Sequence, residues 1–249
     1  MLRGYESYSF RRGKKRTRRL LWSVVRLIVI LLVLYLIVTE ILLISERIAT
    51  NSMAPTILSR ERVIASPVVY GIRLPFSQQR ILEIGRPKRG DVVVIQPPYL
   101  ERESVVQRIL NSFAQFFTLQ QRRLFPERMS KGAGSHLIKR IVGVPGDTIV
   151  VKELIAYIKP VNQVKFYRES DLIPFDYGIK TDGFKANWPK ELPFSGNMHE
   201  IELGETEYFV LGDNRNSSSD SRSWGPITLD RIIAKVILRY WPLNKLGSP

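Results

Sequence analysis

The sequence predicts a mainly β fold: an antiparallel β-sheet or barrel-like domain with a smaller inserted β subdomain, preceded by one N-terminal transmembrane helix. An apolar run of membrane-spanning length lies near the N-terminus, and most later apolar segments are short and rich in β-branched and aromatic residues. Turn-forming residues separate these segments. The pattern shows no regular strand–helix alternation, which favours an antiparallel arrangement over a Rossmann-type fold.

The apolar run reads from Leu20 to Val38 with the single charge Arg26, and beyond Thr39 and Glu40 it is extended by Ile41 to Ile44. Because roughly 20 apolar residues cross the hydrocarbon core, we expect an anchor over residues 20–44. Residues 1–19 form a basic tail with eight basic residues and one acid, which predicts a cytoplasmic N-terminus and an exported remainder. Three alternatives are weaker: a cleavable signal peptide, a buried soluble helix, or a tail that binds nucleic acid.

The exported part divides into a β core over residues 45–154 and 207–249 and an inserted subdomain over residues 155–206, where the patterning is weaker. Turns such as Pro145-Gly146-Asp147 delimit the strands. The predicted strands are residues 62–65, 91–95, 136–144, 147–153, 207–211 and 232–240.

One segment, about residues 101–124, has helical rather than strand periodicity. Its apolar residues recur from Val105 to Phe117 at spacings of three and four, and the stripe weakens beyond Phe117. Such a helix either lies on an anionic membrane surface or covers the core or a sheet edge, and the sequence leaves both possibilities open.

Composition excludes several kinds of site. The 249 residues contain no cysteine, which rules out disulfides, cysteine nucleophiles and cysteine zinc sites. The two histidines, His136 and His199, have no evident partner carboxylate motif, so neither a histidine-rich metal site nor a serine–histidine triad is expected. The net charge of +15 is unevenly distributed, because residues 1–19 contribute +7 and the remaining 230 residues contribute +8.

Three polar segments are candidates for chemistry. Ser52 lies in a turn just beyond the anchor, where most serines only bond neighbouring backbone. Strand alternation puts Lys139 on the same face as Leu137 and Ile141, and burial of an ammonium lowers its pKa toward that of a usable base, although most lysines are solvated. The third segment, residues 212–225, is dense in short polar side chains, but its spacing does not fit an EF-hand.

Five motifs in order, an apolar anchor and four segments downstream of it, resemble those of the bacterial type I signal peptidases (leader peptidases). They are Ser52-Met53-x-Pro55-Thr56, Arg89-Gly90-Asp91, Lys139-Arg140-x-x-Gly143-x-Pro145-Gly146-Asp147, Gly212-Asp-Asn-Arg-x-x-Ser218-x-Asp220-Ser-Arg222 and the anchor itself. The resemblance implies a serine endopeptidase that removes N-terminal signal peptides after a small-x-small site, without a cofactor.

The resemblance also implies roles for individual residues. Ser52 matches the nucleophile and Lys139 the general base, while Thr50 and the Ser52 N–H match the oxyanion hole. Ser218 matches the serine that orients the lysine, although Ser217 and Ser219 leave its register open by one residue. The remaining matches are the structural ion pair of Asp220 and Arg222 and the substrate pocket of Ile48, Met53 and Ile138.

The implied partners are signal peptides of exported preproteins and membrane lipid, with no nucleic acid. The anchor and the basic tail predict a single-pass protein of the cell membrane with its catalytic domain on the exported side, and a monomer is the default expectation. The residues alone leave two other classes of protein open. One is a self-cleaving repressor-type protease that uses the same serine–lysine dyad, and the other is a catalytically inert membrane-anchored scaffold or binding protein.

Overall fold

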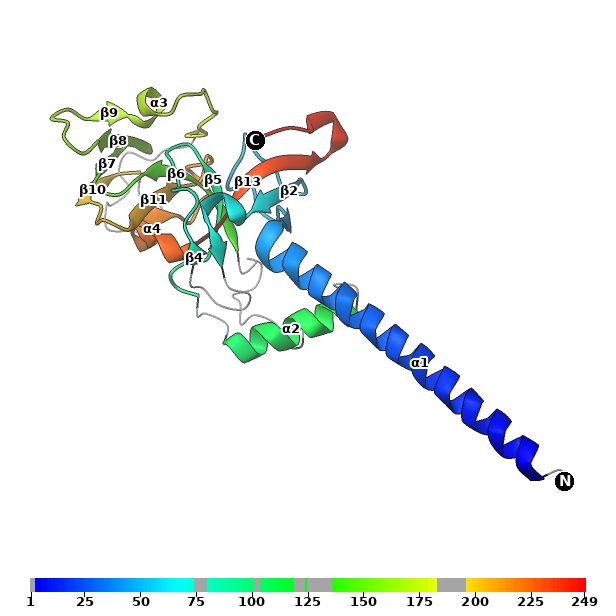
Figure 1. The fold of residues 1–249 in the computed structure, drawn as a ribbon. Coiled ribbons are helices and arrows are strands. Elements are labelled where there is room, and N and C mark those ends of the chain that lie inside the picture. The colour runs from blue at the N-terminus through cyan, green and yellow to red at the C-terminus, as the bar shows by residue number, and fades with distance from the viewer. Residues whose placement is uncertain (1–2, 74–79, 101–103, 119–123, 125–135, 183–195) are drawn as a thin grey trace.

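The computed structural model describes residues 3–73, 80–100, 104–118, 124, 136–182 and 196–249. A long helix, α1 (Arg3–Leu36), projects from a domain of β-strands, as Figure 1 shows. A π-helical segment (Ile37–Leu42) continues α1 and leads directly into the first strand, β1 (Ile44–Arg47). The helix therefore enters the sheet with a single intervening residue, and Ile44, the last residue of the predicted anchor, lies in β1.

A seven-stranded sheet forms the larger part of the domain, in the order β1-β2-β13-β5-β6-β11-β12. Its neighbouring strands pair antiparallel. The β-branched run at residues 92–95 is buried on both faces, as expected of a central strand. Besides β1, its strands are β2 (Arg62–Ser66), β5 (Val92–Ile95), β6 (Leu137–Gly143), β11 (Glu207–Leu211), β12 (Ile227–Thr228) and β13 (Ile232–Trp241).

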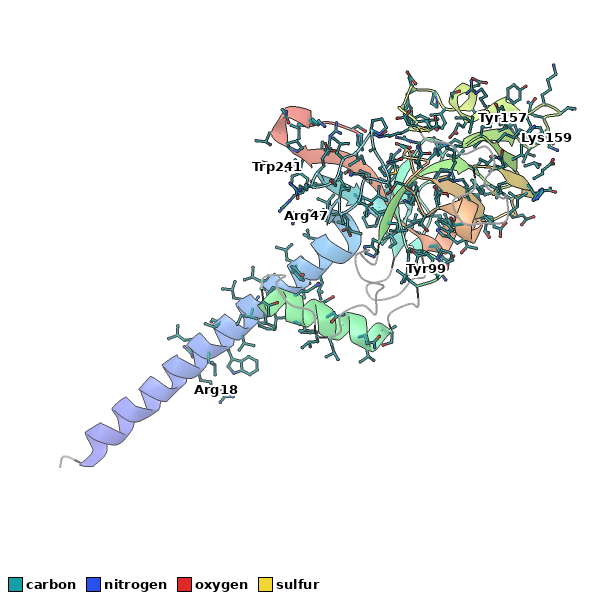
Figure 2. The ribbon with its side chains drawn as sticks, turned by 180° about the vertical axis from the view of Figure 1, so that it is seen from behind. Arg18, Arg47, Tyr99, Tyr157, Lys159 and Trp241 are labelled. Carbon is teal, nitrogen blue, oxygen red and sulfur yellow. The ribbon has the colours of Figure 1, made fainter. Side chains whose placement is uncertain are left out.

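A second sheet of four strands, in the order β10-β7-β8-β9, lies at the end of the domain away from α1 (Figure 1). Figure 2 labels Tyr157 and Lys159 there, whereas Arg47 lies where α1 meets the larger sheet. The strands are β7 (Thr148–Lys152), β8 (Ile155–Lys159), β9 (Tyr167–Arg168) and β10 (Met198–Glu202). The short helix α3 (Glu169–Leu172) follows β9 directly.

Besides three short 3₁₀ helices, four further elements lie outside these two sheets in the described part of the chain. The strands β3 (Ile72–Arg73) and β4 (Arg80–Leu82) pair with each other, and α4 (Ser221–Trp224) follows the polar segment at residues 212–220. The helix α2 (Val105–Phe117) begins with a capping box, in which the Ser104 hydroxyl accepts a hydrogen bond from the Gln107 N–H and the Gln107 side chain accepts one from the Ser104 N–H.

The larger sheet is curled. Three strands separate β1 from β6 in the sheet order, yet Nδ1 of His136, just before β6, lies 2.9 Å from Oε1 of Glu46 in β1. The curl gives the sheet one concave apolar face, where Val63, Val92 and Val236 pack in one buried cluster. The sheet thereby brings the turn after β1 towards the strand that carries Lys139.

The predicted antiparallel β fold, with its second sheet and its long N-terminal apolar helix, is confirmed. The six predicted strands are present, and α2 occupies the described part of the predicted helix at residues 101–124, of which residues 101–103 and 119–123 lie outside the described residues. The division into sheets differs from the predicted division at one point. Strand β7 pairs with β8 and β10, so the smaller sheet begins near residue 148 rather than 155.

Candidate active site

Ser52 lies in the turn that connects β1 to β2. Two backbone hydrogen bonds close the base of this turn, from the Ile48 N–H to the Glu61 carbonyl and from the Arg60 N–H to the Ile48 carbonyl. The Ser52 carbonyl accepts a hydrogen bond of 3.1 Å from the Asn214 N–H, and the Asn214 amide donates to the Asn51 carbonyl at 3.2 Å. These contacts join the turn to the polar segment 212–220, so two distant motifs of the sequence meet here.

The Thr50 hydroxyl donates a hydrogen bond of 3.2 Å to Oγ of Ser52. Thr50 is exposed and Ser52 is half-buried, so both hydroxyls lie at the domain surface. A threonine two residues before a serine thus supplies a donor beside the serine oxygen, which is the position from which a hydroxyl can stabilise charge that develops on a bound carbonyl.

Lys139 is buried in β6, with only 1% of its surface exposed. Its neighbours along the same face of the strand, Leu137 and Ile141, pack in a second apolar cluster, as strand alternation predicts. Burial lowers the pKa of Lys139 to about 8, with Arg222 adding to the fall and with Asp220 and Asp213 opposing it. A lysine with this pKa is partly neutral at neutral pH and can accept a proton.

Ser218 is the buried member of three consecutive serines. Ser217 is exposed and Ser219 is half-buried, whereas Ser218 is 1% exposed. Within the described residues, Oγ of Ser218 has no hydrogen-bond partner. Such a group costs free energy unless it has a function or an additional partner, so its burial distinguishes Ser218 from its neighbours as the candidate contact of the lysine.

Gly212 brings Ser52 and Ser218 together. A Cβ atom at this glycine would lie 2.2 Å from Oγ of Ser218 and 2.5 Å from the carbonyl oxygen of Ser52, which are closer than real contacts allow. Both groups therefore pack against the same face of Gly212, and only a residue without a side chain permits the approach.

Buried ion pairs support the segment 212–222, and two of them lie close to Lys139. Arg222 binds Asp220 through two hydrogen bonds of 2.8 and 2.9 Å, and Asp220 also accepts one of 3.1 Å from the Gly212 N–H. Arg140, next to Lys139 in β6, binds Asp213 through bonds of 2.9 and 2.8 Å. The predicted pair of Asp220 and Arg222 is thus present in the structure, and a second pair joins the lysine-bearing strand to the same segment.

A comparison of the chain with protein families identifies a match over most of its length. The family described as "Signal peptidase, peptidase S26" matches residues 21–241. This chain belongs to that family. The matched range includes the apolar part of α1 and each of the residues described above, so the recognition made from the five motifs is confirmed.

Named relatives agree with this family. The chain is 26% identical over 202 residues to signal peptidase I of Leptolyngbya laminosa, covering 81% of this chain and 70% of that protein. It is 26% identical over 203 residues to the chloroplastic thylakoidal processing peptidase 1 of Arabidopsis thaliana, covering 82% of this chain and 43% of that protein. It is 35% identical over 108 residues to signal peptidase IB of Staphylococcus aureus, covering 43% of this chain and 54% of that protein. The chain therefore spans only about half the length of the last two relatives.

Among solved structures, a signal peptidase I of Enterococcus faecalis V583 is similar, with a TM-score of 0.34 and 21% identity. The similarity covers 62% of this chain and 99% of that chain.

The three residues predicted to line a substrate pocket lie together in this peptidase S26 chain. Met53 and Ile48 are buried in one apolar cluster of the larger sheet, and Ile138, which is partly buried, packs against it. Because Ile138 precedes Lys139 in β6 and Met53 follows Ser52, the cluster adjoins both candidate catalytic residues. Their role in substrate recognition stays a prediction.

Sequence reasoning missed several contacts of the site. His136 has a carboxylate partner, Glu46, which only the curl of the sheet brings near, because the two residues are 90 positions apart. Arg140 and Asp213, which form a second pair, are 73 positions apart. The sequence offers one indication of this pair: Arg140 directly follows Lys139, and Asp213 directly follows Gly212. His199 lies in β10 of the smaller sheet.

Proposed function

We propose that this chain is a membrane-anchored serine endopeptidase that removes signal peptides from exported preproteins, with Ser52 as nucleophile and Lys139 as general base. One observation supports this dyad above the others: a lysine with a pKa lowered to about 8 is buried beside the segment that packs on Ser52. Membership of the signal peptidase family supports the substrate class.

In the proposed mechanism, the neutral amine of Lys139 accepts the Ser52 proton while Oγ forms a bond to the carbonyl carbon of the scissile peptide. The Thr50 hydroxyl and the Ser52 N–H donate hydrogen bonds to the oxyanion. The carbon–nitrogen bond then breaks, and Lys139 returns its proton to the leaving amine. Water, deprotonated by the same lysine, hydrolyses the acyl-enzyme and releases the signal peptide.

Each supporting residue has a role that follows from its contacts. Ser218, with a buried hydroxyl that lacks a partner among the described residues, would orient the Lys139 amine. The pair of Asp220 and Arg222 would hold the segment in place. Ile48, Met53 and Ile138 would select small side chains at the cleavage site by excluding larger ones. The whole site comes from one chain, which supports action as a monomer.

The helix α1 is the proposed anchor. Residues Arg18–Leu36 are long and apolar enough to cross a membrane, and none of this stretch is buried inside the protein. Trp22 and Tyr35 lie near its two ends, as aromatic residues do at membrane–water interfaces. The basic residues before it favour a cytoplasmic N-terminus, which would put the site on the exported side, close to tethered substrates.

The experiment is cleavage of a preprotein with an Ala-x-Ala site by the full chain, at pH values from about 6 to 10. We expect cleavage by the wild type and by Lys152→Ala, an exposed lysine of β7, and none by Lys139→Ala or Ser52→Ala. Turnover that persists in Lys139→Ala would keep a peptidase but refute the dyad. Absence of cleavage by folded wild type would favour the inert scaffold.

A further inference from the structure

The helix α2 has its polar side buried and its apolar side exposed, which is the reverse of a helix that packs on a soluble core. Val106, Leu110, Phe113 and Phe117 fall within about 60° of the helix circumference, and they are 64%, 39%, 40% and 67% exposed. Asn111 and Ser112, by contrast, are 4% and 5% exposed, and both have interaction partners. We call the four exposed residues the α2 stripe.

The helix α2 meets α1 at the end of the apolar stretch that is long enough to span a membrane. The rings of Phe116 and Tyr35 are 5.4 Å apart, and Tyr35 is one residue before Leu36, where that stretch ends. Figures 1 and 2 both show α2 diverging from α1 on the side of the β domain. The α2 stripe thus lies at the level where α1 would leave the hydrocarbon core.

Length and charge distinguish the possible occupants of this surface. Thirteen residues extend about 20 Å, which is too short to cross a bilayer of about 30 Å. The helix contains one basic residue and no acidic residue, so anionic headgroups would not repel it. Because Phe116 contacts both Tyr35 of α1 and Phe117 of the stripe, the same lipid that surrounds α1 can also cover α2.

We propose that α2 lies in the lipid–water interface, with the α2 stripe buried among the upper acyl chains, as a second membrane contact of the catalytic domain. The proposal rests on the membrane anchoring proposed for α1. A single spanning helix leaves a domain free to tilt. A second membrane contact at the α2 stripe, with α2 held against α1 by the Phe116 and Tyr35 rings, would fix its orientation. The interfacial helix therefore holds the Ser52 turn at a defined height above the membrane.

The test uses the absence of cysteine from the chain. Three valines, Val29 in α1, Val106 in α2 and Val164 between β8 and β9, are each replaced by cysteine and labelled with a polarity-sensitive fluorophore. Val164, which is 93% exposed in the connection between two strands of the smaller sheet, is the matched control. The labelled full-length proteins are placed in vesicles of phosphatidylcholine and phosphatidylglycerol that contain lipids spin-labelled either near the headgroup or deep in the acyl chain.

We expect the fluorophore at Val106 to emit at a shorter wavelength than the one at Val164 and to be quenched by the spin label near the headgroup. The fluorophore at Val29 should be quenched by the spin label deep in the acyl chain. The fluorophore at Val164 should be quenched by neither. Val106 emission equal to that at Val164 would refute the interfacial helix alone, provided that Val29 is quenched. A blue-shifted but unquenched Val106 label would also refute it, because protein rather than lipid would then cover the stripe. Loss of quenching at Val29 would refute the anchor, and the inference with it.

A kinetic test addresses the consequence. Leu110→Glu should raise KM for a membrane-tethered preprotein several-fold and leave cleavage of a soluble peptide unchanged, because the substitution opposes insertion without touching the site. Val164→Glu is the matched control and should change neither. Equal KM values for Leu110→Glu and wild type on the tethered substrate would contradict the positioning role.

Discussion

Arg215 and Glu169 form a bidentate ion pair in which both N···O distances are 2.6 Å and both side chains are fully buried. Arg215 also donates to the Gly212 carbonyl, and Glu169 accepts from the Ala156 N–H in β8. The pair therefore links the smaller sheet to the glycine on which Ser52 and Ser218 pack. Together with the apolar packing of β7 and β8 against β6 and β11, this network joins the smaller sheet to the candidate active site.

Glu169→Gln should destabilise the protein strongly. Breaking a buried pair leaves an uncompensated charge, here that of Arg215, and costs about 3–5 kcal/mol. Denaturant unfolding of the purified full chain would measure this, with the exposed Glu205→Gln as control. A loss below about 1 kcal/mol would contradict the supporting role.

The same pair predicts acid sensitivity. Burial alone would raise the pKa of Glu169, but the Arg215 charge and hydrogen bonds outweigh it, so the pKa lies below its ordinary value. A carboxylate whose pKa is lowered by folding stabilises the protein above the unfolded pKa, and this contribution is lost as pH falls through the folded pKa. The free energy of unfolding should therefore decrease as the pH falls below the ordinary pKa range of a carboxyl group. The decrease should be less steep in Glu169→Gln, which has no carboxyl group at this position.

The pH dependence of cleavage should report the environment of Lys139. Because the neutral amine is the base, kcat/KM should fall about tenfold per pH unit below a pKa of about 8. Asp220 raises this pKa, so Asp220→Asn should move the acidic limb of the profile to lower pH. If Asp220 were only structural, the variant would lower the folded fraction and leave the limb where it is.

Ser218→Ala should reduce kcat much more than Ser217→Ala. Only Ser218 is buried, and its hydroxyl faces Gly212 together with the Ser52 carbonyl. Parallel kinetics and thermal unfolding of the two variants would separate positioning from stability. Equal effects of the two substitutions would mean that neither serine orients the lysine.

Much of the fold could be predicted because local pattern decides it. The β-branched run at residues 92–95 could only be a buried strand, and the Pro145-Gly146 turn requires the positive φ of +80° that Gly146 adopts. Strand β1 could not be separated from the anchor, because Ile44 continues the same apolar run. Strand β7 was assigned to the wrong sheet because strand pairing is a tertiary property, which periodicity does not carry.

The candidate site also has parts that the sequence predicts and parts that it does not. Alternation along β6 was enough to predict that Lys139 lies among apolar neighbours. The three serines at residues 217–219 have the same chemistry, so only burial distinguishes them. Arg215 and Glu169 are 46 positions apart, in segments without a shared motif, and nothing local indicates that they meet.

Thr50 offers the sharpest test of the oxyanion contact, because the chain can be changed there without altering its shape. Thr50→Val keeps the volume and removes the hydroxyl that donates to Ser52 at 3.2 Å. Loss of one such donor typically lowers kcat by about 10²–10³ with little effect on substrate binding. Thr50→Ser retains the donor and should remain within a few-fold of wild type.

Single-turnover kinetics on a soluble peptide would measure these two variants without the contribution of the membrane. Since Thr50 is exposed, neither substitution should change the unfolding midpoint, which distinguishes a catalytic loss from a folding loss. Wild-type kcat in Thr50→Val would exclude its hydroxyl from the oxyanion hole. Of the two oxyanion donors proposed here, only the Ser52 N–H would then remain. This donor is a backbone group of the nucleophile, so no side-chain substitution removes it.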